Sequence, residues 1–349
     1  MSKTKNTVIP ASSISKKASE INELSSVYNL VEGDFKQVNA LIPMQLSSDV
    51  DLVEEISTYI VESGGKRLRP LMVLLTAGAL KYNSQKHIYL AAIIEFLHTA
   101  TLLHDDVVDH SDMRRGKLTA NEKWGNAPSV LVGDFLYSRA FQLMVEVGSL
   151  EIMEVLARAT NVIAEGEVLQ LTNVGNLHIS EAKYREVIRC KTALLFEAAT
   201  HTGAILSQLN QPNSVSDEQV QAMQQFGQHF GVTYQLVDDW LDYAGDAATM
   251  GKNVGDDFAE GKLTLPLIFA LQHGTVEDKK IITDAINNRS AEQLPQIQKI
   301  VSESGALDYT HNAAVAESKH ALQCLAQLPN GPYTDALTIL TEYCTARLF

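Results

Sequence analysis

The chain has 349 residues, of which 45% are hydrophobic, and it carries a formal net charge of −14. This charge argues against nucleic-acid binding, and the lack of an uncharged apolar run of about 18 residues argues against an integral membrane segment. Three cysteines at scattered positions are too few for a disulfide framework or a zinc site, so we expect a protein of the reducing cytoplasm.

The N-terminal residues, 1–24, differ in composition from the rest of the chain. They are polar and rich in Ser, Lys and Thr, and they lack the apolar core of a signal peptide. They also contain no Arg, which argues weakly against an organelle transit peptide. We expect residues 1–24 to form a flexible tail and residues 25–349 to form one domain.

Helical periodicity dominates this domain. Apolar residues recur at α-helical spacing in six segments: 71–80, 89–103, 130–147, 152–174, 184–209 and 223–243. A loop is expected at 210–217, where Ser216 is a plausible N-cap with Gln219 three residues later. Several helices are apolar on more than one face, and no alternating Val, Ile and Thr runs indicate a sheet. The sequence predicts an all-α, single-domain bundle around a deep central cavity.

Two aspartate-rich segments of the same form each follow an apolar stretch. They are Asp105-Asp106-Val107-Val108-Asp109 and Asp238-Asp239-Trp240-Leu241-Asp242, and their starts lie 238 − 105 = 133 residues apart. On a helix the first and fifth residues share one face, where carboxylates repel one another. A hard divalent cation removes this repulsion, and Mg²⁺ takes carboxylates together with phosphate oxygens. Each segment alone could be a solvated turn, but two facing segments predict a metal-bridged diphosphate site.

Basic groups accompany the carboxylates in this acidic chain. A Gly-rich turn with cations, Gly64-Gly65-Lys66-Arg67-Leu68-Arg69-Pro70, precedes a helix start, which suits anion binding. The other groups are Met113-Arg114-Arg115-Gly116, Lys191-Thr192, and Gly251-Lys252 with Gly261-Lys262. One group alone could be a solvated surface pair. Since cations and glycines closely follow each Asp segment, we expect a site that holds a negative substrate beside metal ions.

A single histidine lies near the first Asp segment. His98 precedes Asp105 by seven residues, which places it about two helical turns away on the same face. A lone His on an apolar helix is often only a core residue. Because its side chain should point into the same cavity as the carboxylates, we expect His98 to donate a hydrogen bond to a phosphate.

These motifs, in this order, resemble the trans-isoprenyl diphosphate synthases, also called polyprenyl synthetases. Gly166-Glu167-Val168-Leu169-Gln170 and Gly251-Lys252-Asn253-Val254-Gly255-Asp256-Asp257 add to the resemblance, which covers about residues 41–349. Residues 95–116 are especially similar to bacterial octaprenyl diphosphate synthases. The sequence departs from them at Trp240, where those enzymes carry Leu, and in the N-terminal extension.

The resemblance implies an isoprenoid synthase fold, a homodimer, and prenyl transfer from an allylic diphosphate to isopentenyl diphosphate with Mg²⁺. We expect three ions per site, farnesyl diphosphate as the primer, and a long all-trans product, octaprenyl diphosphate, for a ubiquinone side chain. It also implies the metal ligands Asp105, Asp106, Asp109, Asp238, Asp239 and Asp242. By the same resemblance we expect Arg114, Lys191, Lys252 and Lys262 to hold the allylic diphosphate, and Lys66, Arg69, His98 and Arg115 to hold isopentenyl diphosphate. We also expect Thr192 and Gln235 to supply dipoles near the allylic cation.

The expected product length depends on two small residues. Ala100 and Thr101 lie about one helical turn before Asp105, on the side that should face the cavity. In short-chain relatives a bulky aromatic residue at this place blocks the growing chain, so small residues predict a deeper pocket. Tight helix packing would also select Ala and Thr.

Other classes of protein remain as alternatives. Glu95-x-x-His98 and Glu317-x-x-His320 match the Glu-x-x-His spacing of di-iron helical bundles, but that class gives neither Asp segment a role. A terpene cyclase, a C15–C20 synthase and a non-catalytic subunit of a heteromeric synthase are nearer alternatives. Cyclases usually share only the first Asp segment, and the complete set of motifs argues against a non-catalytic subunit.

Overall fold

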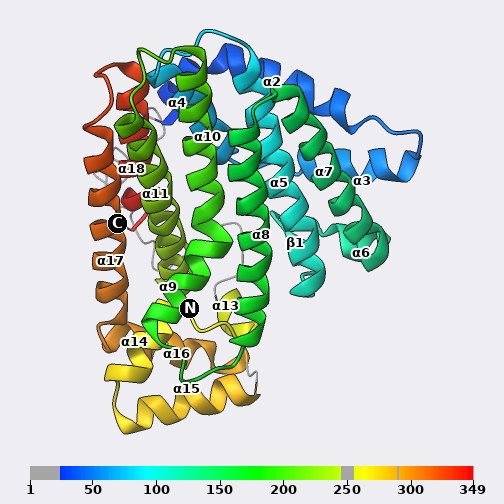
Figure 1. Cartoon of the computed structure of the whole chain (residues 1–349). Coiled ribbons are helices and arrows are strands. Elements are labelled where there is room, and N and C mark those ends of the chain that lie inside the picture. Colours follow the sequence, from blue (N-terminus) through cyan, green and yellow to red (C-terminus); the bar gives the residue numbers. More distant parts are fainter. Residues whose placement is uncertain (1–23, 245–254, 289–290, 349) are drawn as a thin grey trace, which may run out of the picture.

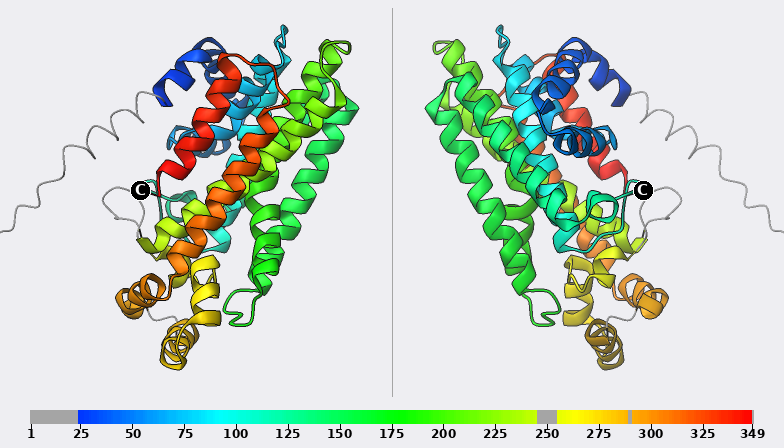
Figure 2. Two further views of the ribbon diagram at one scale, coloured as in Figure 1. Left: turned by 90° about the vertical axis from the view of Figure 1, so that its left-hand side faces the viewer. Right: turned by 90° about the vertical axis from the view of Figure 1, so that its right-hand side faces the viewer.

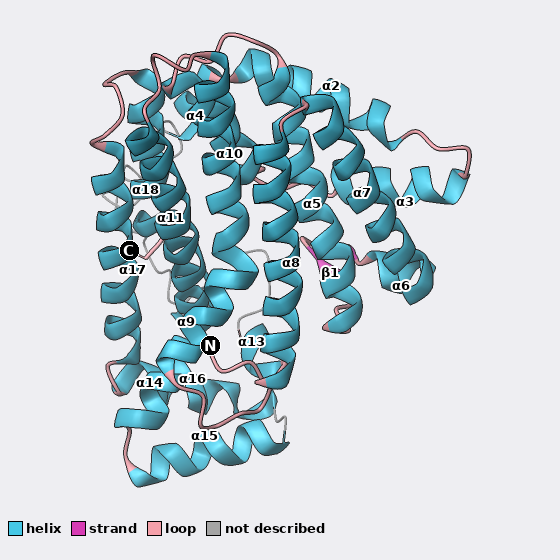
Figure 3. Cartoon of the chain, in the orientation of Figure 1, coloured by secondary structure: helices cyan, strands magenta, loops and turns pink. Residues whose placement is uncertain are grey.

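The computed structural model describes residues 24–244, 255–288 and 291–348, and α-helices dominate it (Figures 1 and 3). The helices are α2 (Glu32–Leu46), α3 (Asp51–Glu62), α4 (Leu68–Ala79), α5 (Lys86–Val108), α6 (Ala120–Trp124), α7 (Asn126–Val147), α8 (Leu150–Thr172), α9 (Glu181–Ile188), α10 (Leu194–Asn210), α11 (Asp217–Ala244), α13 (Asp256–Ala259), α14 (Leu265–His273), α15 (Val276–Asn288), α16 (Leu294–Glu303), α17 (Ala306–Leu325) and α18 (Pro332–Ala346). A further helical stretch spans residues 24–30. The all-α fold class predicted from the sequence is therefore confirmed. The tail predicted at 1–24 falls, except for Leu24, outside the described residues.

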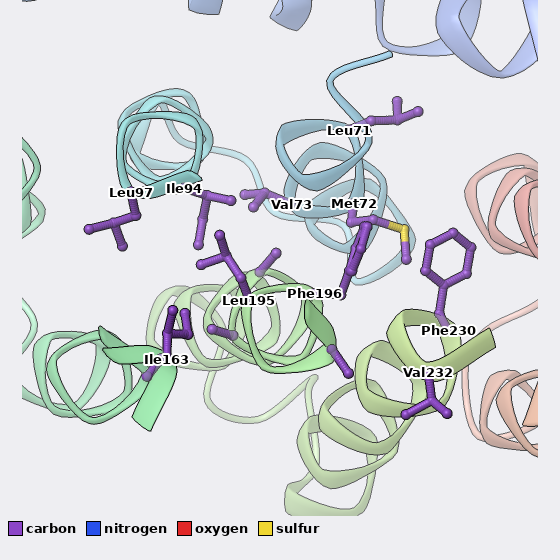
Figure 4. Packing of buried hydrophobic residues seen from close by; sticks show 14 of the residues in the cluster. Leu71, Met72, Val73, Ile94, Leu97, Ile163, Leu195, Phe196, Phe230 and Val232 are labelled. Atoms are coloured by element: carbon purple, nitrogen blue, oxygen red, sulfur yellow. The ribbon is translucent and has the colours of Figure 1, made fainter. Parts of the chain in front are cut away.

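Helix α10 lies at the centre of the bundle, where it packs against α4, α5, α8 and α11. Figure 4 shows this core, in which Leu195 and Phe196 of α10 lie among residues of the surrounding helices, such as Met72 and Ile94. Figure 2 shows α15 and α16 gathered at one end of the bundle. Among the described helices, none combines the length and apolar character that crossing a membrane requires.

The predicted helices agree with the structure, with one informative difference. The loop at 210–217 is present, and Ser216 and Gln219 cap α11 reciprocally through Ser216 N–H to Gln219 Oε1 (3.1 Å) and Gln219 N–H to Ser216 Oγ (3.4 Å). Segment 184–209, expected to be one helix, is instead α9, a π-helical turn at Arg189–Ala193, and α10. In this turn Leu194 N–H donates to the carbonyl of Arg189, five residues back, so one extra residue is inserted.

Two glycines allow neighbouring helices to approach this π-helical turn. A Cβ on Gly166 of α8 would lie 2.8 Å from Cβ of Cys190, and a Cβ on Gly231 of α11 would lie 2.5 Å from Cα of Ala193. Such distances are shorter than carbon atoms tolerate, so both positions require glycine for this packing. The π-helical turn, which carries Lys191 and Thr192, is therefore held between α8 and α11.

A hairpin too short for sequence patterns to indicate follows α5. Strands β1 (Met113–Arg114) and β2 (Lys117–Leu118) pair antiparallel, with Arg114 opposite Lys117. The two residues between them, Arg115 and Gly116, have φ angles of 52° and 76°. A two-residue loop with both φ angles positive is typical of a type I′ turn. The Met-Arg-Arg-Gly motif thus forms a tight turn that presents two arginines.

Candidate active site

The first Asp segment lies at the C-terminal end of α5, and its middle carboxylate is already paired. Asp106 is 0% exposed. It accepts hydrogen bonds from Arg114, from Nε at 2.9 Å and from Nη2 at 2.6 Å. A buried carboxylate needs such a bidentate partner, because burial without one would be strongly unfavourable. Asp106 therefore fixes the position of Arg114 at the edge of the site.

Asp105 and Asp109 face two lysines from distant parts of the chain. Lys262 Nζ donates to Asp109 Oδ2 at 2.8 Å, and Lys191 Nζ lies 3.9 Å from Asp105 Oδ2. Burial raises the pKa of Asp105, and the neighbouring charge of Asp109 raises it further. These two carboxylates thus share one helix turn at an energetic cost that the lysines offset only in part.

The second Asp segment forms the last turns of α11, and two of its three carboxylates are buried. Asp239 accepts hydrogen bonds from the Tyr184 hydroxyl of α9 and from Gln235 Nε2, the latter at 2.7 Å. Asp242 Oδ1 accepts a hydrogen bond from the backbone N–H of Gly255 at 3.2 Å. Asp238 is partly exposed. Asp238 is therefore the most solvent-accessible of the three carboxylates of this segment.

A cavity of about 120 Å³ lies beside the second Asp segment. It is lined by residues of α8, α9, the π-helical turn, α11 and the loop after α13, among them Gln170, Lys191, Thr192, Gln235, Asp239 and Lys262. Thr192 Oγ1 donates to Gln235 Oε1 at 2.8 Å, which joins the π-helical turn to α11. Since Lys191 and Lys262 also approach Asp105 and Asp109, the carboxylates of α5 and α11 lie on opposite sides of one site.

A half-buried basic group lies between α4 and α5. The guanidinium of Arg69 lies 4.2 Å above the ring of Phe196, and its Nη1 is 3.3 Å from His98 Nε2. Burial lowers the pKa of Arg69 to about 10. Burial and the charge of Arg69 lower the pKa of His98 well below its ordinary value, so the imidazole is neutral. Because Arg69 can only donate, His98 Nε2 accepts and Nδ1 carries the proton.

The Gly64–Pro70 turn and the hairpin meet at one point. A Cβ on Gly65 would lie 2.5 Å from Nη1 of Arg115, so the guanidinium rests on the backbone here, and the φ angle of 139° at Gly65 favours glycine. Burial and the charge of Arg114 lower the pKa of Arg115. The exposed Lys66 beside it has its Nζ 3.3 Å from the hydroxyl of Tyr343 in α18. Clustered cations with lowered pKa values favour the binding of an anion.

The donor set suits a hard divalent cation and a diphosphate. Asp105, Asp109 and Asp238 offer carboxylate oxygens, which Mg²⁺ prefers. The buried Nε of Arg69 has no hydrogen-bond partner among the described residues, which indicates a site built for a further acceptor. A bound cation would reduce the repulsion among the carboxylates, and a bound anion would reduce the repulsion among the arginines. The two groups together therefore fit a divalent cation bound with a diphosphate.

Three residues predicted from the sequence to belong to the site are not found at the cavity in the described structure. Lys252 lies outside the described residues. Ala100 is buried and Thr101 Oγ1 donates to the carbonyl of His98 at 2.7 Å, and neither lines the cavity described above. Their effect on product length stays a prediction.

The sequence analysis assigned no role to several residues of this site. Glu167 Oε2 and Gln170 Oε1 of α8 accept hydrogen bonds from Lys191 Nζ at 2.6 and 2.7 Å. Their spacing of one helical turn, within a motif already noted, was the available signal. The pairing of Tyr184 with Asp239 had no signal in the sequence, because the two residues come from different helices.

The di-iron alternative requires its two Glu-x-x-His pairs to meet, and they do not. Glu95 Oε1 lies 3.7 Å from Nε of Arg67, beside the basic group of α4. Glu317 instead bonds His229 of α11, with Oε2 2.7 Å from Nδ1. In the part of the chain that the structure describes, Glu95 and His98 join no group of three possible metal ligands.

Known proteins resemble this chain over most of its length. The family model described as polyprenyl synthetase matches residues 50–304. The octaprenyl diphosphate synthase of Escherichia coli (strain K12) is 47% identical over 325 residues, which cover 93% of this chain and 99% of that protein. A decaprenyl diphosphate synthase structure from Rhodobacter capsulatus has a TM-score of 0.88 at 42% identity, covering 93% of this chain and 99% of that one. A polyprenyl synthase from Caulobacter crescentus CB15, complexed with calcium and isoprenyl diphosphate, has a TM-score of 0.86 at 42% identity, covering 93% and 97%.

These similarities identify the chain as a prenyltransferase. The chain belongs to the polyprenyl synthetase family.

The environment of Glu167 predicts a pH-dependent stability. Burial, with the charge of Asp105, raises the pKa of Glu167 from 4.5 to about 7. A raised pKa in the folded state means that the stability contributed by the protonated form is complete below about pH 4.5 and is lost as the pH rises through about 7. In Glu167→Gln this loss should be absent, so the variant should gain stability relative to the wild type across that window.

Urea unfolding at several pH values, with EDTA present, measures this difference. Glu165→Gln removes the same charge from an exposed position of α8 and is the matched control. Equal pH dependence in Glu167→Gln and the wild-type protein would contradict the assignment.

Proposed function

We propose that this chain condenses an allylic diphosphate, farnesyl diphosphate, with successive molecules of isopentenyl diphosphate to a long all-trans polyprenyl diphosphate. The observation that carries the proposal is the juxtaposition of Asp105, Asp109 and Asp238 with the cluster of Arg69, His98 and Arg115. One group attracts cations and the other attracts anions, as two diphosphates and their counter-ions require.

The carboxylates provide the end of the site for the allylic diphosphate. Asp105, Asp109 and Asp238 would hold Mg²⁺, three ions per site by the family resemblance, and the bound ions would neutralise charge that gathers on the leaving diphosphate. Asp106 would act through Arg114, whose position it fixes, and Asp239 and Asp242 would support Asp238. Lys191 and Lys262 would exchange their carboxylate partners for diphosphate oxygens, with Lys252 in the same role.

The basic group provides the end for isopentenyl diphosphate. Arg69, Arg115 and Lys66 would bind its diphosphate, and the proton on Nδ1 of His98 is available to donate to a phosphate oxygen. Because Arg69 is held by the ring of Phe196 and by His98, little conformational entropy remains to be lost on binding. The substrate's double bond would thereby be placed against the reacting carbon.

The reaction then follows from this placement. The C–O bond of the allylic diphosphate breaks and leaves an allylic cation, near which the oxygens of Thr192 and Gln235 lie as stabilising dipoles. The double bond of isopentenyl diphosphate supplies the electron pair for the new C–C bond. The cation that results loses a proton to the departed diphosphate and forms the new double bond. No side chain is needed as the general base.

Product length is the part of the proposal that relatives leave open, since the similar proteins include an octaprenyl and a decaprenyl diphosphate synthase. We infer an octaprenyl product, for a quinone side chain. The support is the small Ala100 one turn before Asp105, together with the 47% identity to the octaprenyl enzyme over 93% of this chain.

We also propose that the chain acts as a homodimer in the cytoplasm. An apolar stripe on α7 supports the dimer, because Leu131 is 66% and Val145 is 67% exposed, with Val130 and Phe141 beside them. These positions fall within an arc of about 100° on the helix. Exposed apolar patches of this kind often mark protein interfaces.

A product assay tests the proposed reaction. Wild-type protein is incubated with farnesyl diphosphate, radiolabelled isopentenyl diphosphate and Mg²⁺, and we expect one long product of about eight isoprene units. Asp105→Asn should lower turnover at least about 100-fold, equivalent to nearly 3 kcal/mol of transition-state stabilisation. Asp284→Asn, on the exposed face of α15, is the control and should keep full activity. Full activity of Asp105→Asn would refute the mechanism, and a folded wild-type protein without product would favour a non-catalytic subunit.

The same assay tests the role of Ala100. An aromatic side chain at this position would fill the path of the growing chain, so Ala100→Tyr should give shorter products, while isopentenyl diphosphate is still consumed. Ala204→Tyr, a buried position on α10, controls for the general effect of overfilling the core. Unchanged product length in a folded Ala100→Tyr protein would show that residue 100 does not limit the length of the product.

Light scattering after size-exclusion chromatography tests the dimer. Introducing two charges with Leu131→Glu and Val145→Glu should convert the dimer to monomers, because burying unpaired carboxylates is unfavourable. Val276→Glu changes a residue that is 87% exposed on α15 and should leave the mass unchanged. A wild-type protein with the mass of one chain would overturn this part of the proposal.

A further inference from the structure

A second group of potential metal ligands lies away from the Asp segments, where α11 and α17 run side by side (Figure 1). His229 of α11 meets Glu317 and His320 of α17, and one ligand atom from each of the three lies within 4.8 Å of the other two. Glu317 and His320 are three residues apart, so they project from one face of α17 toward α11.

The geometry of this group is close to that of a three-ligand zinc site. With zinc–ligand bonds of about 2.0–2.1 Å, neighbouring ligand atoms in a tetrahedral site are about 3.3 Å apart. His229 Nδ1 and Glu317 Oε2 are 2.7 Å apart, and no pair among the three exceeds 4.8 Å. His320 is exposed, so a side-chain rotation without movement of the helix can bring its ring nitrogen closer.

The electrostatic surroundings prepare the carboxylate for a cation. Glu317 Oε2 lies 2.7 Å from Nδ1 of His229, so the carboxylate and the imidazole already meet at one point. Arg185 Nη1 lies 3.4 Å from Glu317 Oε1, while its Nε bonds Glu181 at 2.8 Å. Oε2 of Glu317 therefore faces the histidines, and Oε1 faces the competing arginine.

We propose that His229, Glu317 and His320 form a Zn²⁺ site that joins α11 to α17. Two imidazole nitrogens and one carboxylate are a ligand set that zinc accepts, with water in the fourth position, whereas Mg²⁺ prefers oxygen ligands alone. Zinc would replace the hydrogen bond between His229 and Glu317 by two coordinate bonds.

The site is separate from the catalytic one but shares a helix with it. His229 precedes Asp238 by 238 − 229 = 9 residues on α11, a rise of about 13.5 Å. Bound zinc would fix this part of α11 against α17 and so stiffen the helix that carries the second Asp segment.

Zinc binding by the untagged, full-length protein is the test. The protein is titrated with ZnCl₂ by isothermal titration calorimetry, with millimolar Mg²⁺ present to occupy the Asp segments. We expect one Zn²⁺ per chain, and at least about tenfold weaker binding in both His229→Gln and His320→Gln. His273→Gln, an exposed histidine on α14, is the control and should bind as the wild type does. Arg185→Gln should bind severalfold more tightly, because it removes the competing cation.

Each other outcome overturns the proposal. No uptake of Zn²⁺ by the wild-type protein, or equal binding in the His320→Gln variant, excludes the site. Zinc binding that is lost in Asp105→Asn and kept in the two histidine variants places the ion at the catalytic carboxylates. Because His320 is exposed, its variant should fold and decides the question even if His229→Gln does not.

Discussion

Crowding of like charges is the constraint on which this site depends. Asp105, Asp109 and Asp238 stand in the last turns of α5 and α11, where the carbonyl ends of the helices add partial negative charge. A short distance away, Arg69 and Arg115 are held close together at the cost of lowered pKa values. The surrounding helices pack tightly enough to keep both groups in place. The folded protein thus holds like charges together at an energetic cost, which bound cations and diphosphates would reduce.

Much of this arrangement follows from local sequence. Two Asp segments of identical spacing, each followed by cations, were enough to predict a diphosphate site, because carboxylates that share a helix face repel one another unless cations lie between them. The helices could also be predicted, since their apolar residues recur at 3.6-residue spacing. The cap formed by Ser216 and Gln219 is a contact between near neighbours in the chain, and such contacts can be predicted without knowledge of the tertiary structure.

Contacts between distant segments could not be predicted in the same way. The sequence cannot tell that Asp106 turns away to Arg114, that Tyr184 of α9 bonds Asp239 of α11, or that Glu167 holds Lys191. Each of these contacts depends on how a helix is rotated about its axis. A shift of the helix by one residue would direct a different side chain to the same neighbour. The glycine at position 65 is similar, since only the folded hairpin shows that it makes room for Arg115.

The π-helical turn at Arg189–Ala193 sets how the side chains of α9 are rotated about the helix axis relative to those of α10. Helix α10 after it serves the core, whereas α9 before it carries Tyr184 to Asp239. In a regular helix, removing one residue turns everything on one side by about 100°. Deleting the inserted residue would therefore leave both halves helical but swing Tyr184 away from its partner. The one inserted residue thus lets a single helical segment direct Tyr184 to Asp239 and its apolar residues to the core at the same time.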